Sequence, residues 1–197
     1  MTGAIGAGKS EALAALARLG AATLSSDEVV HELYGTDDVR DAVVARYGPE
    51  VAPGGVVDRA ALATRVFASE EERRWLEGVL WPLVGARVAA WRAALEQRDP
   101  APVAAVVEVP LLFEAGMDAL FDATLAITAP EELRAVRVAA RGHAALAERS
   151  ARQLPAAEKA RRATYVVANE GTLGDLEQSL SEVLRKHQAM TERSGGV

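Results

Sequence analysis

The chain contains no cysteine, which excludes disulfide bridges and metal sites built on thiolates. No apolar run approaches the ~20 residues that a membrane-spanning helix needs. The first residues also lack the basic and then apolar build of a signal peptide. We therefore expect a cytoplasmic protein that works without a membrane. The histidines, His31, His143 and His187, show no metal-ligand spacing, so no histidine metal centre is predicted.

Basic charge is scarce and unevenly distributed. The 197 residues include 22 basic and 28 acidic side chains, giving a formal net charge of −6. This balance argues against nucleic acid as the main partner. Residues 131–162 are an exception, because eight basic side chains stand there against four glutamates. Arginine's planar fork suits phosphate, but genomic base composition explains an arginine excess equally well, and both interpretations stay open.

Short apolar runs alternate with helical patterns along most of the chain. The apolar runs predict buried strands over 21–24, 103–109, 123–128 and 165–168. Between the apolar runs at 21–24 and 103–109, residues 36–98 read as several helices, with breaks at Gly48-Pro49, Pro53-Gly54-Gly55 and Trp81-Pro82. The pattern predicts an α/β fold with a parallel sheet, helices on both of its faces, and an inserted helical lobe.

The most specific motif lies at the start of the chain. Its residues match G-x-x-x-x-G-K-[ST] in full: Gly3, Ala4, Ile5, Gly6, Ala7, Gly8, Lys9 and Ser10. Backbone N–H groups of such a loop converge on phosphate oxygens, and the next helix directs its positive dipole end at the same anion. We expect Lys9 to reach the β- and γ-phosphates of ATP and Ser10 to bind Mg²⁺. An accidental Lys-Ser after a Gly/Ala-rich turn is the alternative.

A buried strand normally precedes this kind of loop, yet only Met1 and Thr2 stand before it. The first strand is therefore expected to be missing or truncated, or the natural chain starts upstream. We favour an upstream start, because loss of a central strand would remove many buried contacts and ladder hydrogen bonds.

Four further motifs follow the loop in order. They are Leu24-Ser25-Ser26-Asp27, then Val109 to Glu114 (VPLLFE), then an arginine set ending at Gln153, then Lys159 to Gly171. In this order they resemble the dephospho-coenzyme A kinase family over nearly the whole chain. The resemblance implies a P-loop kinase that uses ATP and Mg²⁺ to phosphorylate the ribose 3′-hydroxyl of dephospho-CoA, the final step of coenzyme A biosynthesis.

The resemblance assigns the general base to Asp27. A sugar hydroxyl is a weak nucleophile, and a carboxylate within hydrogen-bond reach can orient it and accept its proton. Without the family, Asp27 reads as a helix N-cap, and the two roles can coexist. Ser25 stands where the family usually has a second Asp, which removes one negative charge from the expected metal region.

The VPLLFE run implies a metal carboxylate and part of a substrate pocket. Glu108 ends an apolar strand, as a Walker-B acid does, and is expected to hold Mg²⁺ through water; a solvated strand end is an equal alternative. The next four residues are expected to form a wall of the acceptor pocket, with ordinary core packing as the alternative: Pro110, Leu111, Leu112 and Phe113.

The arginine set implies a lid, shorter than the family usually has. Arg137 and Arg141 are four residues apart, hence on one helix face, and are expected to act in catalysis by contacting phosphate. Arg149 is expected to bind substrate. A solvated helix face is the alternative for each arginine. Asn169 and Gly171 are expected to form the turn near the adenine of ATP, although both residue types also favour a plain turn.

The helical block resembles the family's acceptor-binding domain. Arg59 and Arg65 are candidates for the acceptor's phosphates, with surface ion pairs as the alternative. Trp81-Pro82 replaces the family's usual His-Pro. The expected divisions are core over 1–34, acceptor lobe over 35–98, core over 99–130, arginine-rich lid over 131–162, and core with a closing helix over 163–197.

Two other functions remain open from the sequence. One is a different small-molecule P-loop kinase that acts on a nucleoside monophosphate or a sugar acid. The other is a nucleotide-binding module that has lost catalysis, a reading supported by the short start, Ser25 and the trimmed lid. For the kinase that the resemblance implies, we expect a monomer or small homo-oligomer that binds dephospho-CoA and neither nucleic acid nor membrane.

Overall fold

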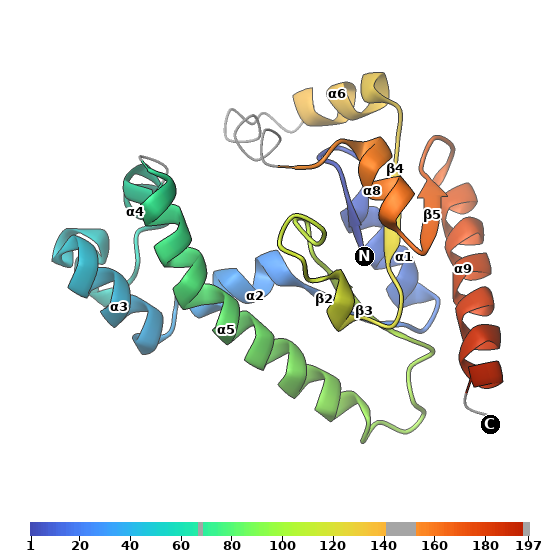
Figure 1. Ribbon diagram of the computed structural model, residues 1–197, viewed down its shortest axis with the longest axis horizontal. Coiled ribbons are helices and arrows are strands. Elements are labelled where there is room, and N and C mark those ends of the chain that lie inside the picture. Colours follow the sequence, from blue (N-terminus) through green and yellow to red (C-terminus); the bar gives the residue numbers. More distant parts are fainter. Residues whose placement is uncertain (67–68, 141–152, 195–197) are drawn as a thin grey trace. The chain divides into compact units, whose positions relative to one another are not determined.

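The computed structural model describes residues 1–66, 69–140 and 153–194. The chain divides into two compact units (Figure 1). The first unit comprises Met1–Thr23 with Arg98–Val197, and the second comprises Leu24–Gln97. The first unit contains most of the strand residues and the phosphate-binding motif, and the second is mainly helical. No helix among the described residues is long and apolar enough to span a membrane.

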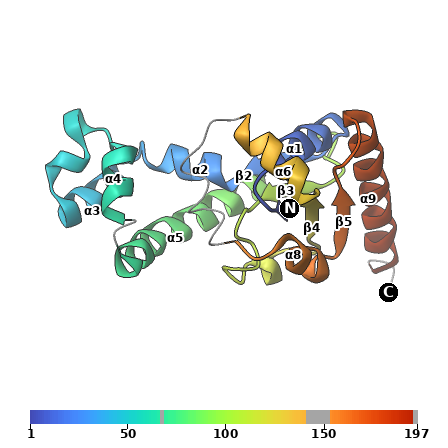
Figure 2. The ribbon, with the colours of Figure 1, turned by 90° about the horizontal axis from the view of Figure 1, so that it is seen from above.

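A parallel sheet forms the centre of the first unit. β4 (Leu125–Thr128) pairs in parallel with both β1 (Thr2–Gly3) and β5 (Tyr165–Ala168). β2 (Ala22–Ser25) pairs with β3 (Ala105–Glu108), and the Ala22 N–H donates a 2.9 Å hydrogen bond to the Ala104 carbonyl. Figure 2 shows β4 and β5 side by side. The α/β fold with parallel pairing agrees with the prediction.

The strand that should precede the phosphate-binding loop is present as β1 and is two residues long. The Met1 ammonium donates a 2.6 Å hydrogen bond to the Val107 carbonyl, and the Val109 N–H donates one of 2.9 Å to the Met1 carbonyl. In parallel strands, one residue forms hydrogen bonds with the two residues that flank the residue opposite it, as Met1 does here with Val107 and Val109. These bonds join the two sets of strands, so the spatial order is β2-β3-β1-β4-β5.

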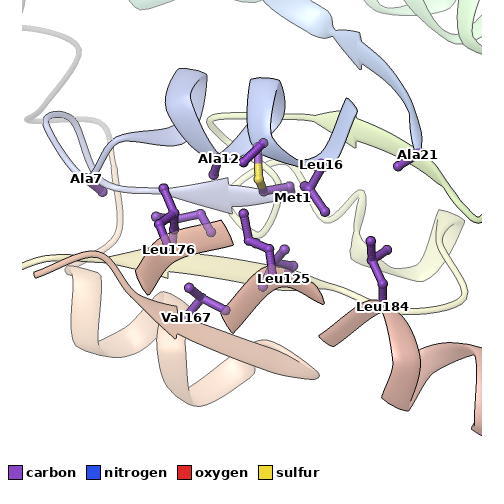
Figure 3. Packing of buried hydrophobic residues seen from close by; sticks show 12 residues of the cluster. Met1, Ala7, Ala12, Leu16, Ala21, Leu125, Val167, Leu176 and Leu184 are labelled. Carbon is purple, nitrogen blue, oxygen red and sulfur yellow. The ribbon is translucent and has the colours of Figure 1, made fainter. Parts of the chain in front are cut away.

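Helices cover both faces of this sheet. On one face, α1 (Lys9–Arg18) packs against β3 and α9, while α9 (Leu173–Ser194) packs against β5. Leu125 and Ile127 of β4 point into this layer, together with the side chains shown in Figure 3. Successive strand residues alternate between faces, so the fully buried Ala126 points the other way, where α8 (Ala156–Arg162) packs against β4 and β1.

The second unit is built around one long helix. α5 (Glu70–Leu95) packs against α2 (Ser26–Leu33), α3 (Asp37–Tyr47) and α4 (Arg59–Val66). Two short 3₁₀ turns, Pro49–Val51 and Pro53–Gly55, connect α3 to α4. The Asp58 side chain accepts hydrogen bonds from the N–H groups of Ala60 and Ala61, at 2.9 and 3.1 Å, and so caps α4. The remaining described elements are α6 (Glu131–Ala139) and the 3₁₀ turn Asp118–Leu120.

The break predicted at Trp81-Pro82 does not occur, because α5 runs through it. Proline removes one helical hydrogen bond, at a cost of about 3 kcal/mol in a helix interior. Leu76 and Leu80 are buried in the core of this unit on the same helix, and their burial offsets that cost. Trp81 itself is 41% exposed, while Trp75 packs edge-on against Tyr47 at 5.4 Å between ring centroids.

Candidate active site

The loop from Gly3 to Ser10 connects β1 to α1. Gly8 precedes the first helical residue in a left-handed conformation, with φ of 92°. A Cβ at this position would also collide with the side chain of Asn169. Only glycine fits both restrictions, so the loop turns sharply and the N-terminus of α1 begins at Lys9.

Two side chains from other elements hold this loop. Asn169, buried just after β5, donates a 2.9 Å hydrogen bond from Nδ2 to the Ala7 carbonyl. Arg137 of α6 donates to the carbonyl of Gly6 at 3.5 Å and to that of Asn169 at 3.2 Å. Two predicted site residues that are 32 positions apart thus meet on the phosphate-binding loop. Gly171, in the exposed turn that follows, lies beside the Asp175 carboxylate.

Lys9 and Glu108 lie together at the carboxyl ends of β1 and β3. Their Nζ and Oε1 atoms are 4.0 Å apart, and both side chains are almost covered, at 13% and 11% exposure. Lys9 Nζ also donates to the Ala4 carbonyl at 3.4 Å. A largely covered cation and carboxylate beside a loop of backbone N–H groups have the chemistry that suits a phosphate chain and its counter-ion.

A divalent cation would find oxygen ligands here. The Glu108 carboxylate and the exposed Ser10 hydroxyl are the hard donors that Mg²⁺ prefers. Among residues 1–66, 69–140 and 153–194, no group of three or more His, Asp and Glu side chains is placed to hold a metal by itself. That donor set suits Mg²⁺, which usually takes one or two protein ligands and completes its shell with water and substrate phosphate.

Some side chains after β3 are more buried than expected for residues that line a substrate pocket. Leu112 and Phe113 are 1% and 4% exposed, and the Arg162 guanidinium lies 4.7 Å from the centre of the Phe113 ring. Pro110 and Leu111 are partly exposed. Their expected contact with the acceptor stays a prediction.

Three predicted acceptor-site residues belong to the second unit. Asp27 is exposed in the first turn of α2, whose N-cap is Ser25, so the N-cap reading of Asp27 is wrong. Arg59 contacts His31, with 2.5 Å between NH1 and Nδ1. Arg65 lies 3.6 Å from the Glu50 carboxylate.

Part of the predicted lid lies outside the described residues. Arg141 and Arg149 fall there, as do residues 142–148 and 150–152. The described parts of the predicted lid are residues 131–140, which include α6, and residues 153–162, which include α8.

Sequence reasoning assigned no role to three residues behind the loop: Glu114, Gln153 and Lys159. Lys159 is 1% exposed, and Gln153 accepts a 3.1 Å hydrogen bond from the Ile5 N–H. All three lie within the motifs recognised in the sequence, and that position was the available signal.

A mainly apolar cavity of about 390 Å³ opens at the other end of the sheet. Met1, Tyr165 and His187 line it, with residues that begin β3 and β4. It lies at the amino ends of the strands, whereas ligands of open α/β sheets bind at the carboxyl ends. The cavity is therefore separate from the phosphate-binding loop.

The strand order, the glycine-rich loop and the loop lysine beside an acidic strand end together define a P-loop kinase. A family model described as dephospho-CoA kinase matches residues 1–175. The dephospho-CoA kinase of Deinococcus radiodurans is 39% identical over 189 residues, which cover 94% of this chain and 90% of that protein. The chain belongs to the dephospho-CoA kinase family, which performs the final step of coenzyme A biosynthesis.

Solved structures agree with this fold. The crystal structure of TT1252 from Thermus thermophilus is similar, with a TM-score of 0.77 and 37% identity, and the match covers 94% of each chain. A dephospho-CoA kinase from Campylobacter jejuni has a TM-score of 0.65 at 23% identity, with 96% of each chain covered, and shares the fold.

Proposed function

We propose that the first unit binds ATP with Mg²⁺ and that the helical unit binds dephospho-CoA, whose ribose 3′-hydroxyl receives the γ-phosphate. The observation that carries the nucleotide half is the loop from Gly3 to Ser10 held by Asn169 and Arg137, with Lys9 and Glu108 side by side. Family membership supports the acceptor. The protein is proposed to act in the cytoplasm.

The residues of this chain divide the work of phosphoryl transfer. The loop N–H groups and Lys9 bind the phosphates, which positions the γ-phosphate for in-line attack. Arg137 already lies on the loop and is proposed to stabilise the charge that spreads over the transferred group, with Arg141 in the same role. Ser10 and Glu108, the latter through water, would hold Mg²⁺, which neutralises charge between the β- and γ-phosphates.

Asp27 is proposed to orient the 3′-hydroxyl and to accept its proton as the new phosphate ester forms. Asp27 is an exposed residue in the first turn of α2, which is consistent with this role. Arg59 and Arg65 are proposed to bind the phosphates of the acceptor. Phosphate contacts would then replace the present contacts of Arg59 with His31 and of Arg65 with Glu50. Arg149 and residues Pro110 to Phe113 are proposed acceptor contacts, and Asn169 with Gly171 is proposed to border the adenine.

The direct test is coupled ADP release with ATP and Mg²⁺, with and without dephospho-CoA. The Asp27→Asn variant should lower acceptor-dependent turnover by about 10²- to 10⁴-fold while ATP affinity is unchanged. Glu28→Gln, the neighbouring exposed carboxylate in the same helical turn, is the matched control and should keep wild-type turnover.

Other outcomes distinguish the competing functions. Wild-type protein that binds ATP but shows no turnover with dephospho-CoA would indicate a degenerate nucleotide-binding module. Turnover with a nucleoside monophosphate or a sugar acid in place of dephospho-CoA would indicate a different acceptor. Full activity in Asp27→Asn would remove the general-base role.

A further inference from the structure

A charged lysine is buried behind the phosphate-binding loop. The Lys159 side chain in α8 is 1% exposed, although lysine is almost never fully buried without partners. Burial lowers the pKa of the Lys159 ammonium, and the hydrogen bond and charge of Glu114 oppose that shift. Because burying a charge is costly, its partners indicate what the charge is for.

Lys159 makes three contacts, which is the full donor capacity of an ammonium group. Nζ lies 2.6 Å from the Pro110 carbonyl, 2.8 Å from Glu114 Oε1 and 3.4 Å from Thr2 Oγ1. Thr2 belongs to β1, which leads into the loop, whereas Pro110 and Glu114 follow β3. One ammonium therefore joins the two segments at the point where they leave the sheet.

Gln153 adds a second bridge between the same segments. Its Oε1 accepts the 3.1 Å hydrogen bond from the Ile5 N–H inside the loop, and its Nε2 donates to the Pro110 carbonyl at 3.3 Å. Thr2 Oγ1 donates to that carbonyl as well, at 3.3 Å. The Pro110 carbonyl is thus a common acceptor for β1, for the residues before α8 and for α8 itself.

Glu114 connects the network to the chain that enters α8. Its Oε1 accepts a 2.7 Å hydrogen bond from the Leu154 N–H in addition to the Lys159 contact. Its Oε2 is buried and has no hydrogen-bond partner in the part of the chain that the structure describes. Lys159 is therefore the charge that compensates this carboxylate.

The inference rests on the proposed function, in which the two joined segments carry the groups that meet the nucleotide phosphates. The segment from β1 continues into Lys9, and Glu108 stands two residues before Pro110, with 4.0 Å between Lys9 Nζ and Glu108 Oε1. We propose that Lys159 is a positioning residue for phosphoryl transfer, which holds the phosphate-binding loop and the Glu108 segment in register through Thr2, Pro110 and Glu114 without touching the nucleotide. It acts on the ATP side of the reaction.

The test compares Lys159→Met with the charge-balanced double variant Lys159→Met/Glu114→Gln. The glutamine keeps an acceptor for the Leu154 N–H while removing the unpaired charge. Lys186→Met, which removes an exposed lysine of α9, is the matched control. Each protein is assayed for thermal unfolding, for ADP binding by calorimetry, and for the KM values of ATP and dephospho-CoA.

We expect Lys159→Met to unfold at a lower temperature and the double variant to regain much of that loss. In both, ADP binding should weaken and the ATP KM should rise about tenfold, as is common when groups behind a binding shell are removed. The KM for dephospho-CoA should stay near its wild-type value. A purely structural role would instead lower the amount of active enzyme and leave both KM values unchanged.

Two results would overturn the proposal. One is a double variant with wild-type ADP affinity and wild-type ATP KM, which would show that Lys159 only neutralises Glu114. The other is Lys159→Met with unchanged nucleotide affinity. If Lys159→Met alone does not fold, the double variant decides by the same two measurements.

Discussion

The side-chain amide of Asn169 donates a 2.9 Å hydrogen bond to the carbonyl of Ala7. This bond links the end of β5 to the middle of the phosphate-binding loop, across 162 positions of sequence. The Asn169 backbone N–H also donates to the Thr128 carbonyl at 2.8 Å, so the sheet fixes the backbone from which this side chain extends. The loop conformation therefore depends on β5, which lies near the C-terminal end of the chain.

Replacing Asn169 with alanine should loosen the loop. The Ala7 carbonyl would lose its partner, and loss of a buried hydrogen bond costs about 1–3 kcal/mol. We expect a lower free energy of unfolding in urea and weaker ADP binding by calorimetry. Gln188→Ala, an exposed amide of α9, should change neither. Unchanged ADP affinity in Asn169→Ala would show that the loop holds its shape without this bond.

Gly8→Ala should be far more damaging than alanine at a glycine with no neighbouring atoms around its Cβ position, such as Gly85. The left-handed backbone at Gly8 disfavours any Cβ by about 1–3 kcal/mol, and the new methyl group would displace Asn169. We expect reduced thermal stability and loss of ATP binding.

Gly85→Ala is the matched control for this substitution. Gly85 lies inside α5, and an added Cβ meets nothing within 4 Å. Alanine should stabilise that helix by about 0.5–1 kcal/mol. Thermal unfolding of the two variants should therefore move in opposite directions, and a shift in the same direction would contradict this account of the loop.

Arg137→Met should lower kcat more than it lowers stability. The guanidinium donates to the carbonyls of Gly6 and Asn169, at 3.5 and 3.2 Å, which aims it at the loop. Removing one group that stabilises the transferred charge commonly costs about 10²- to 10³-fold in kcat. Steady-state kinetics should show this loss, while Arg185→Met, exposed on α9, should be wild type. A change in thermal stability alone would mean that Arg137 is structural.

Acid should destabilise the helical unit through Glu72. The Arg46 guanidinium donates to this carboxylate at 2.7 and 2.9 Å and the Tyr47 hydroxyl at 2.6 Å, and these bonds lower the pKa of Glu72 from 4.5 to about 2. A carboxyl group with a depressed folded-state pKa stabilises the fold above its unfolded pKa. That contribution is lost as the pH falls from about 4.5 through about 2.

The measurement is urea unfolding of wild type and Glu72→Gln between pH 2 and pH 6. The difference in unfolding free energy should be largest near pH 6 and should shrink toward pH 2. Glu71→Gln removes a carboxylate that is 85% exposed and 3.8 Å from Arg46, and should have little effect at any pH. A pH-independent difference for Glu72→Gln would show that ionisation of Glu72 does not stabilise the fold.

Local sequence patterns predicted most of the elements in the first unit. The strand expected over 165–168 is β5 as observed, and the apolar runs at 103–109 and 123–128 contain β3 and β4. Buried parallel strands are easy to recognise in a sequence because both of their faces are apolar, which gives a continuous apolar run. Element ends were less accurate, since Ser25 and not Asp27 occupies the N-cap position of α2.

The helical unit was less predictable. Pro82 is a strong local signal for a break, yet the packing of α5 against three other helices overrides it. The helical unit begins at Leu24, whereas the acceptor lobe expected from the sequence spans 35–98. A compact unit is defined by which residues contact one another. Contacts between distant segments are not encoded in any one window of sequence.

The sequence by itself determined the chemistry of the nucleotide site. G-x-x-x-x-G-K-[ST] restricts the backbone to a tight loop at a helix N-terminus, and that restriction is local. Only the tertiary structure decided which side chains hold that loop. Asn169, Arg137, Gln153 and Lys159 come from three separate stretches after β4, and the pairing of parallel strands with the packing of α8 brings them to Ala7, Gly6, Ile5 and Thr2. Hydrogen bonds of this kind form between groups that are near in space, so their partners follow from the fold and not from spacing along the chain.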